Sequence, residues 1–321
     1  MKEREEERMI DIKKILVPVD FSEPSKQAVN YGLSLALQYN ARLVLTHIVP
    51  SNVGMVYTFP MESFAFEKEQ SAYAKSMLPD LVPSEYRERV NLETVVKIGS
   101  VADELLGIVK NDKVDLVVMG THGRKAFERF LLGSLTERML RKMPVPILTV
   151  SHLNPASELP AAGPVPLRNV LYATDLSDSA EVGLKFSLEL ARGAGAHLTV
   201  LHVLATEMIY WGAEGGYLTK ELETLREDAF KRLQLSIPEQ WCEGVKVNPL
   251  MTEGDAYREI LRVADEESSD LIVLNLQGRS LVERALLGST AERVIRSAHV
   301  PVLSIPVPAA YLAAEVKGTA A

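Results

Sequence analysis

The chain has 321 residues, of which 47% are hydrophobic and 24% charged, and this suits about two globular domains. A formal net charge of −8 argues against a nucleic-acid partner, because neutralising phosphates requires a basic surface. The single cysteine, Cys242, excludes an intrachain disulfide. The sequence shows neither a secretory signal nor an apolar run of roughly 18–20 residues, so we expect a cytoplasmic protein with no membrane partner.

Strands and helices are predicted to alternate along residues 11–150, the first predicted domain. Each strand is an unbroken run of Val, Ile and Leu, which is typical of a parallel strand buried on both faces. The five predicted strands cover residues 13–19, 42–49, 91–97, 115–119 and 145–150. Helices are predicted at residues 23–39, 100–111 and 135–143, and the segment 50–88 is predicted to be partly helical. Ser22 is the expected N-cap of the first helix.

The second half of the chain repeats the first at a distance of 155 residues. Asp20 recurs as Asp175, and residues 131–150 and 286–305 agree at 10 of 20 positions. The second domain is predicted at residues 168–308, between a proline-rich linker at 151–167 and a tail at 309–321. Its predicted strands cover residues 169–174, 197–204, 245–250, 270–274 and 300–305. The predicted fold class is α/β, with two tandem open parallel five-stranded sheets that carry helices on both faces.

A loop with three glycines follows the fourth predicted strand. Residues 120–134 read GTHGRKAFERFLLGS, a G-x2-G-x9-G-S pattern that ends at a helix start. Open α/β sheets bind ligands at the carboxyl ends of their strands, and a helix N-terminus offers N–H groups to a phosphate. Asp20 can accept hydrogen bonds from a ribose or an adenine amine, and Arg124 can pair with a phosphate. The pattern indicates phosphate binding.

Helix capping is the alternative interpretation of the same residues. Ser134-x-x-Glu137 and Ser289-x-x-Glu292 fit capping boxes, and Asp20 with Ser22 can cap the first helix. The two interpretations are compatible, because a cap can open to meet a ligand. Neither G-x-S-x-G nor G-x4-G-K-[ST] occurs, so no nucleophile elbow and no P-loop is predicted.

The motifs together resemble the universal stress protein family in its tandem form. The resemblance rests on the glycine pattern, on Pro18-Val19-Asp20, on Leu45-Thr46-His47-Ile48 and on the last strand, and it extends from about residue 11 to 308. The family implies a Rossmann-like fold related to adenine-nucleotide α-hydrolases, and one branch binds ATP, which we expect here with Mg²⁺. The implied nucleotide-binding residues are Pro18, Val19, Asp20, Ile48, Met119, Gly120, His122, Gly123, Arg124, Gly133, Ser134 and Leu135. No residue is assigned to catalysis or to a metal.

The second predicted domain departs from the pattern in its loop. Asn275 replaces Gly120, Gln277 replaces His122 and Ala173 replaces Pro18; the matching residues that remain are Asp175, Val203, Gly278, Arg279, Gly288 and Ser289. Asn tolerates a positive φ, yet a side chain at residue 275 could crowd the phosphate path. We predict that the first domain binds nucleotide and the second binds weakly or not at all, with two occupied sites as the alternative.

Three other features carry predictions. His47 and His202 lie within apolar strands and are predicted to be structural, whereas the role of His122 stays open between ligand and loop packing. Residues 51–66 could cover the site or pack elsewhere. The last strand of each sheet could pair with the other, which would make an internal pseudo-dimer, and copies of the chain could also form a homodimer.

The predicted function is that of an intracellular stress-response ATP-binding protein, a nucleotide-dependent switch or partner-binding module. The alternatives are a nucleotide-independent dimerisation or interaction protein and a weak ATPase. Dedicated catalysis is not expected, because no general base is placed by the sequence to activate water.

Overall fold

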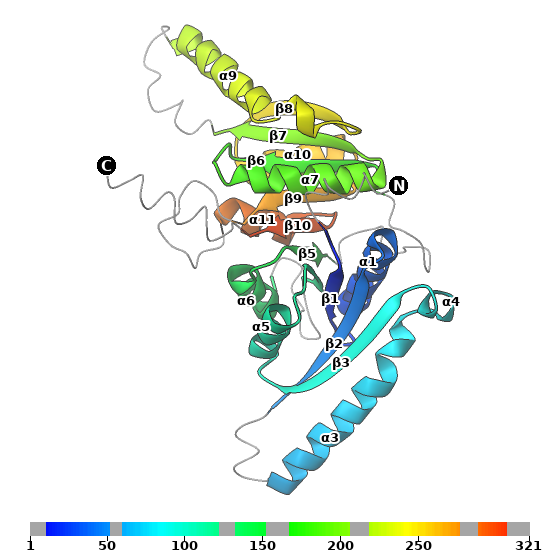
Figure 1. The fold of residues 1–321 in the computed structure, drawn as a ribbon. Coiled ribbons are helices and arrows are strands. Elements are labelled where there is room, and N and C mark those ends of the chain that lie inside the picture. Colours follow the sequence, from blue (N-terminus) through cyan, green and yellow to red (C-terminus); the bar gives the residue numbers. More distant parts are fainter. Residues whose placement is uncertain are drawn as a thin grey trace. The chain divides into compact units, whose positions relative to one another are not determined.

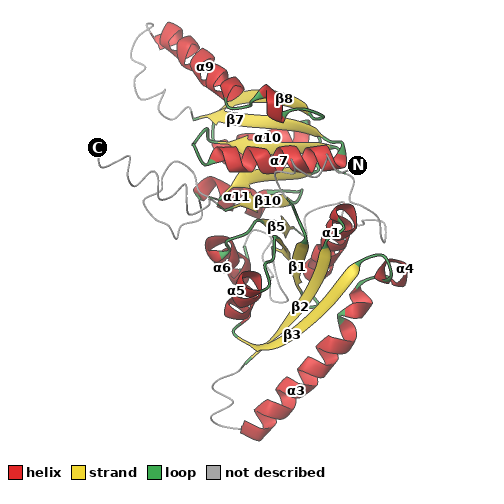
Figure 2. Cartoon of the chain, viewed as in Figure 1, coloured by secondary structure: helices red, strands yellow, loops and turns green. Residues whose placement is uncertain are grey.

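The computed structural model describes residues 11–51, 60–121, 132–151, 167–205, 218–276 and 288–306. The chain separates into two compact units, and we name Asp11–Val165 the first unit and the part from Pro166 onward the second unit. In each unit, strands alternate with helices (Figures 1 and 2).

The described residues of the first unit form five strands. These are β1 (Lys14–Pro18), β2 (Arg42–Pro50), β3 (Asn91–Gly99), β4 (Leu116–Gly120) and β5 (Ile147–Val150). The helices are α1 (Glu23–Tyr39), α3 (Pro60–Met77), α4 (Ser84–Arg87), α5 (Val101–Asn111) and α6 (Ser134–Lys142), with a 3-10 turn η1 (Pro79–Leu81). α1 has the bounds predicted for it, and the segment predicted to be partly helical contains α3 and α4.

The strands of the first unit pair in parallel, in the order β3-β2-β1-β4-β5. Pro18 of β1 lies opposite Thr46 of β2, and Leu16 lies opposite Val117 of β4. The chain moves from β1 to β2 on one side and later returns to β4 on the other, so the strand order reverses between β1 and β4. Ligands of open α/β sheets bind at the carboxyl ends of strands beside such a switch point. The topology therefore favours a site after β1 and β4.

Both faces of this sheet are buried. Ile15, Leu16 and Val17 are consecutive in β1, and all three are fully buried. Consecutive residues of a strand point to opposite faces, so helices must cover both. Gly32 of α1 lies so close to the sheet that an added Cβ would be 2.6 Å from Cγ2 of Val17, and this glycine lets α1 pack directly on β1.

The second unit has the same strand order, β8-β7-β6-β9-β10, and its described pairs are also parallel. The strands are β6 (Asn169–Thr174), β7 (His197–Leu204), β8 (Lys246–Glu253), β9 (Leu271–Asn275) and β10 (Val302–Ile305). The helices are α7 (Ala180–Ala194), α9 (Leu218–Leu235), α10 (Ala256–Glu266) and α11 (Ser289–Ser297), with a 3-10 turn η3 (Glu239–Trp241). The α/β class with parallel sheets, predicted from the sequence, is confirmed.

The last strand of each unit is shorter than predicted. β5 and β10 begin after Pro146 and Pro301, whereas the prediction included these prolines. Proline has no N–H to donate to a neighbouring strand. The carbonyls of the two prolines still accept hydrogen bonds from Val117 at 3.0 Å and Ile272 at 3.1 Å, so each proline marks the start of the strand pairing.

A repeated aspartate fastens the start of each sheet. Oδ2 of Asp115 accepts hydrogen bonds from the backbone N–H groups of Lys13 at 2.9 Å and Lys14 at 2.8 Å. Asp270 makes the equivalent pair of bonds in the second unit. These aspartates lie at the amino ends of the strands, so their recurrence in the sequence has a structural cause.

Candidate functional site

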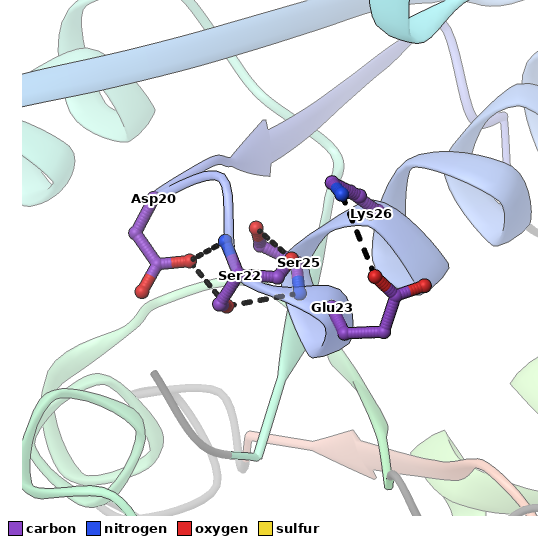
Figure 3. A network of polar contacts seen from close by, with 5 residues as sticks. All are labelled: Asp20, Ser22, Glu23, Ser25 and Lys26. Carbon is purple, nitrogen blue, oxygen red and sulfur yellow. Dashed lines mark hydrogen bonds and ion pairs between the residues drawn. The ribbon is translucent and has the colours of Figure 1, made fainter. Parts of the chain in front are cut away.

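The turn after β1 is closed by hydrogen bonds around Asp20 (Figure 3). Oδ1 of Asp20 accepts hydrogen bonds from the backbone N–H of Ser22 at 3.0 Å and from the Ser22 hydroxyl. Ser22 is the N-cap of α1, and its Oγ accepts a hydrogen bond from the N–H of Ser25 at 3.4 Å. The capping role predicted for Ser22 is confirmed, and Asp20 holds this N-cap residue in place. The same bonds fix the carboxylate at the carboxyl end of β1.

Phe21, between these two residues, has a φ of +63°, a conformation that bulky side chains rarely adopt. Leu176, at the same place in the second unit, has a φ of +58°. The left-handed region costs a non-glycine residue roughly 1–2 kcal/mol, and such strain tends to collect at functional sites. The Phe21 ring centroid lies 5.1 Å from that of His47 on β2 and 5.8 Å from that of Tyr73 on α3. The sequence assigns Phe21 no role, because nothing in a phenylalanine signals a left-handed φ.

The two ends of the loop after β4 are held together. The N–H of Thr121 donates to the carbonyl of Val150 at 3.0 Å, and the N–H of Gly133 donates to the carbonyl of Thr121 at 2.9 Å. The hydroxyl of Thr136 on α6 donates to the carbonyl of Gly120 at 3.0 Å. The loop therefore leaves and rejoins the sheet at one point. The predicted residues His122, Gly123 and Arg124 lie outside the described residues.

Gly120 is required by the first turn of α1. A Cβ at residue 120 would lie 2.8 Å from Cβ of Pro24 and 3.0 Å from the Pro24 carbonyl carbon. A contact this short against backbone forces the helix to move. The first glycine of the motif thus has a packing role between β4 and α1, independent of any ligand.

α6 begins at the end of the motif without a side-chain cap. Its N-cap is Gly133, and the exposed Ser134 is its first helical residue. Glu137, which a capping box would use, pairs with Arg141 at 2.9 Å. The capping-box interpretation of Ser134 is therefore wrong. An exposed hydroxyl and the first N–H groups of the helix lie together as donors, where the helix dipole favours an anion.

The capping-box interpretation is also wrong in the second unit. Gly288 is the N-cap of α11, Ser289 is the first helical residue, and no side chain caps this helix. Glu292 pairs with Arg296 at 2.5 Å instead. The two units therefore begin this helix in the same way.

The predicted residues of the first unit that the structure describes lie at the carboxyl edge of the sheet. Val19, Ile48 and Met119 are buried, whereas Asp20 and Gly120 are partly exposed. Pro18 ends β1, and Gly133, Ser134 and Leu135 form the start of α6. The switch point thus has a fixed carboxylate after β1 and an uncapped helix start after β4. This arrangement can accept hydrogen bonds from hydroxyl or amine groups and can donate hydrogen bonds to an anion.

The second unit keeps the turn after its first strand. Oδ1 of Asp175 accepts hydrogen bonds from the N–H of Ser177 at 3.1 Å and from its hydroxyl at 2.7 Å. Val203, on β7, is partly exposed, and the predicted residues Gly278 and Arg279 lie outside the described residues.

Asn275 ends β9 at the position of Gly120. Its amide N–H donates to the carbonyl of Ser179 at 2.8 Å, and its Oδ1 is buried without a hydrogen-bond donor among the residues that the structure describes. A Cβ added to Gly183 of α7 would lie 2.2 Å from this oxygen. The side chain of Asn275 therefore points toward α7, whereas the sequence led us to expect it in the phosphate path.

The start of α7 differs from that of α1. α7 begins at Ala180, two residues later than α1 by the repeat. The N–H of Ala180 bonds to the carbonyl of Ser177, three residues back, whereas Lys26 bonds to Ser22, four residues back. Ser179, the N-cap of α7, makes no side-chain cap bond. The first turn of α7 is thus rebuilt beside Asn275.

Both strand histidines make structural hydrogen bonds. Nδ1 of His47 lies 2.7 Å from the carbonyl of Val19, and Nδ1 of His202 lies 3.0 Å from the carbonyl of Thr174. A carbonyl only accepts, so Nδ1 carries the proton and donates in each case. The structural role predicted for the two histidines is confirmed.

The electrostatics of the second site include one perturbed group. Tyr172 of β6 donates its hydroxyl to the carbonyl of Ala180 at 2.6 Å, and its burial raises the pKa of Tyr172 above the usual value, so the phenol stays neutral. Among the described residues, no three His, Cys, Asp or Glu side chains are grouped to hold a metal ion. Within the same residues, no helix combines the length and apolar character needed to cross a membrane.

Comparisons with known proteins agree with the repeat. Residues 11–151 and 166–306 each match the model of the universal stress protein family. A universal stress protein of Methanocaldococcus jannaschii is 33% identical over 144 residues, 44% of this chain and 83% of that protein. One of Mycolicibacterium smegmatis is 27% identical over 301 residues, 91% of this chain and 96% of that protein. The crystal structure of one from Archaeoglobus fulgidus covers 92% of this chain and 99% of its own, with a TM-score of 0.67 and 22% identity, and it shares the fold.

Proposed function

The chain belongs to the universal stress protein family in its tandem form, and from this premise we propose that its first unit binds an adenine nucleotide. The protein then acts in a stress response as a cytoplasmic ATP-dependent switch or partner-binding module. The second unit binds nucleotide weakly or not at all.

The start of α6 is the observation that supports this proposal most. Ser134 is exposed there, the N-cap is Gly133, which has no side chain to cap the helix, and Glu137 is paired with Arg141. An uncapped helix start beside the switch point of an open α/β sheet leaves donors for phosphate oxygens. Capping alone gives no reason for a serine at this place.

The roles of the site residues follow from their positions. We assign the adenine and ribose to Pro18, Val19, Asp20 and Ile48, with the Asp20 carboxylate accepting from the ribose or the adenine amine. The ribose and inner phosphates lie at Met119, Gly120, His122, Gly123 and Arg124, and the outer phosphates lie at Gly133, Ser134 and Leu135. Mg²⁺ is held by phosphate oxygens, as it commonly is in nucleotide sites.

A switch needs a ligand that favours one state of the protein over another. ATP that contacts both Asp20 and the start of α6 ties the end of β1 to the helix that follows β4. A partner that recognises this edge of the sheet then distinguishes the ATP-bound form from the free form.

Calorimetric titration of the full chain with ATP and Mg²⁺ tests the proposal. We expect one nucleotide per chain, lost in Gly123→Val and retained in the matched control Gly278→Val. Two nucleotides per chain would contradict the asymmetry between the units. If the wild-type chain binds none, the nucleotide proposal is wrong.

A nucleotide-independent interaction protein is the second candidate. α3 exposes large apolar side chains, with Phe64 70%, Phe66 56% and Tyr73 51% exposed, and exposed aromatic residues often mark interaction surfaces. Sedimentation of the chain with and without ATP separates the candidates, because an interaction protein would associate equally in both conditions. The same experiment tests the predicted internal pseudo-dimer against a homodimer.

A further inference from the structure

The two units differ at one strand end beside the candidate site. In the first unit, Gly120 has no Cβ, and the first turn of α1 fills the space, with Pro24 in contact. In the second unit, Asn275 places a Cβ and an amide at this position. A Cβ there is incompatible with a helix that starts as α1 does, because it would lie 2.8 Å from the Pro24 side chain.

The second unit accommodates Asn275 by a set of matched changes. Gly183 stands where the first unit has Ala28, and a Cβ at residue 183 would lie 2.2 Å from the Asn275 oxygen and 2.7 Å from the ring and hydroxyl of Tyr172. The carbonyl of Ser179 turns to accept the amide at 2.8 Å, and the helix then begins at Ala180. The late start of α7 therefore accompanies the side chain of Asn275 together with that of Tyr172, whose hydroxyl donates to the carbonyl of Ala180 at 2.6 Å.

This arrangement leaves two buried acceptors without donors in the described part of the chain. Oδ1 of Asn275 is buried and finds no hydrogen-bond donor in the described part of the chain. Oδ2 of Asp175, the residue equivalent to the candidate ligand-binding Asp20, is also buried and lacks a donor among those residues. Buried acceptors without partners are unfavourable, and departures from good packing and pairing concentrate at functional positions.

We propose that Asn275 is a lock that holds the nucleotide site of the second unit closed by displacing the first turn of α7. The inference rests on the proposed nucleotide binding of the first unit and names the residue that makes the units unequal. Among the described residues, the helix start on the other side of the second site matches the first unit, because α11 has Gly288 as its N-cap and α6 has Gly133. We therefore expect the removal of this side chain to open the second site to nucleotide.

The test is calorimetric titration of the full chain and of Asn275→Gly with ATP and Mg²⁺. We expect one nucleotide per chain in the wild type and two in Asn275→Gly, the second with a Kd within about tenfold of the first. Asn275→Ala is the matched control, because it removes the amide and keeps the Cβ that displaces the helix. Asn275→Ala should still bind one nucleotide per chain.

The outcomes separate this inference from the proposed function. One nucleotide in both the wild type and Asn275→Gly overturns the lock and leaves the first-unit site standing. A wild type that binds none while Asn275→Gly binds one supports the lock and overturns the first-unit assignment. Two nucleotides in the wild type overturn the lock, because a closed site would not bind, and so does a second nucleotide in Asn275→Ala.

The reciprocal exchange gives an independent test in the first unit. Gly120→Asn combined with Ala28→Gly installs the lock together with its matched glycine. We expect this double variant to fold, as judged by circular dichroism, and to lose ATP binding by at least about tenfold. A folded double variant that binds ATP as the wild type does would overturn the inference.

Discussion

The connection from β1 to α1 and the connection from β6 to α7 share the same turn after the strand but differ where the helix begins. Asp20 and Asp175 hold the same turn, with Ser22 and Ser177 as donors. Beyond the turn, α1 starts with a serine cap, whereas α7 starts two residues later without a side-chain cap. In the second unit, Asn275 at the end of β9 and Tyr172 of β6 both bond to backbone carbonyls at the start of α7, whereas Gly120 at the end of β4 leaves room for the first turn of α1.

The starts of α6 and α11, in contrast, are alike in the two units. Each has a glycine N-cap followed by an exposed serine, and a glycine has no side chain to cap the helix. Among the described residues of the candidate site, the two units therefore differ at the start of α1 and α7 and agree at the start of α6 and α11.

The largest expected effect is a loss of ATP affinity on substitution of the aspartate after β1. Asp20→Ala removes a charged acceptor from the proposed site and should weaken ATP binding about 10- to 100-fold, because hydrogen bonds to charged groups contribute roughly 1.5–3 kcal/mol. Asp175→Ala should leave the measured affinity unchanged, since the second site is closed. Calorimetry on both variants measures the contrast. Equal weakening in the two variants would contradict the asymmetry.

A smaller effect, on the free energy of unfolding, is expected from substitutions at the ends of β4 and β9. Gly120→Ala should lower the free energy of unfolding by about 1–3 kcal/mol, because the new Cβ overpacks against the first turn of α1. Asn275→Ala should change it by less than about 1 kcal/mol, since the lost amide bond is offset by removal of a buried oxygen that has no donor. Urea denaturation measures both values. A larger loss in Asn275→Ala would mean that the asparagine stabilises the second unit.

The sequence predicted the fold well because its signals are local. Unbroken runs of Val, Ile and Leu indicate strands buried on both faces, and Ser22 with Pro24 marks the start of α1 at the residue observed. The side-chain direction of Asn275 could not be predicted, because it depends on Gly183, a residue distant in the sequence. The capping box at Ser134 failed for a related reason: Glu137 has a competing partner in Arg141.

The smallest expected effect is a difference in the free energy of unfolding between substitutions of Ser22, the N-cap of α1, and Ser134, the first residue of α6. Ser22→Ala should lower the free energy of unfolding by about 1 kcal/mol, because the N–H of Ser25 loses its cap. Ser134→Ala should change it by less than about 0.5 kcal/mol, since Ser134 is exposed and is not the N-cap of α6, and should weaken only ATP binding. Ser289→Ala is the matched control in the second unit and should alter neither quantity. If Ser134→Ala destabilised the protein as much as Ser22→Ala, capping would account for the motif serine, and its assignment to phosphate would lose its main support.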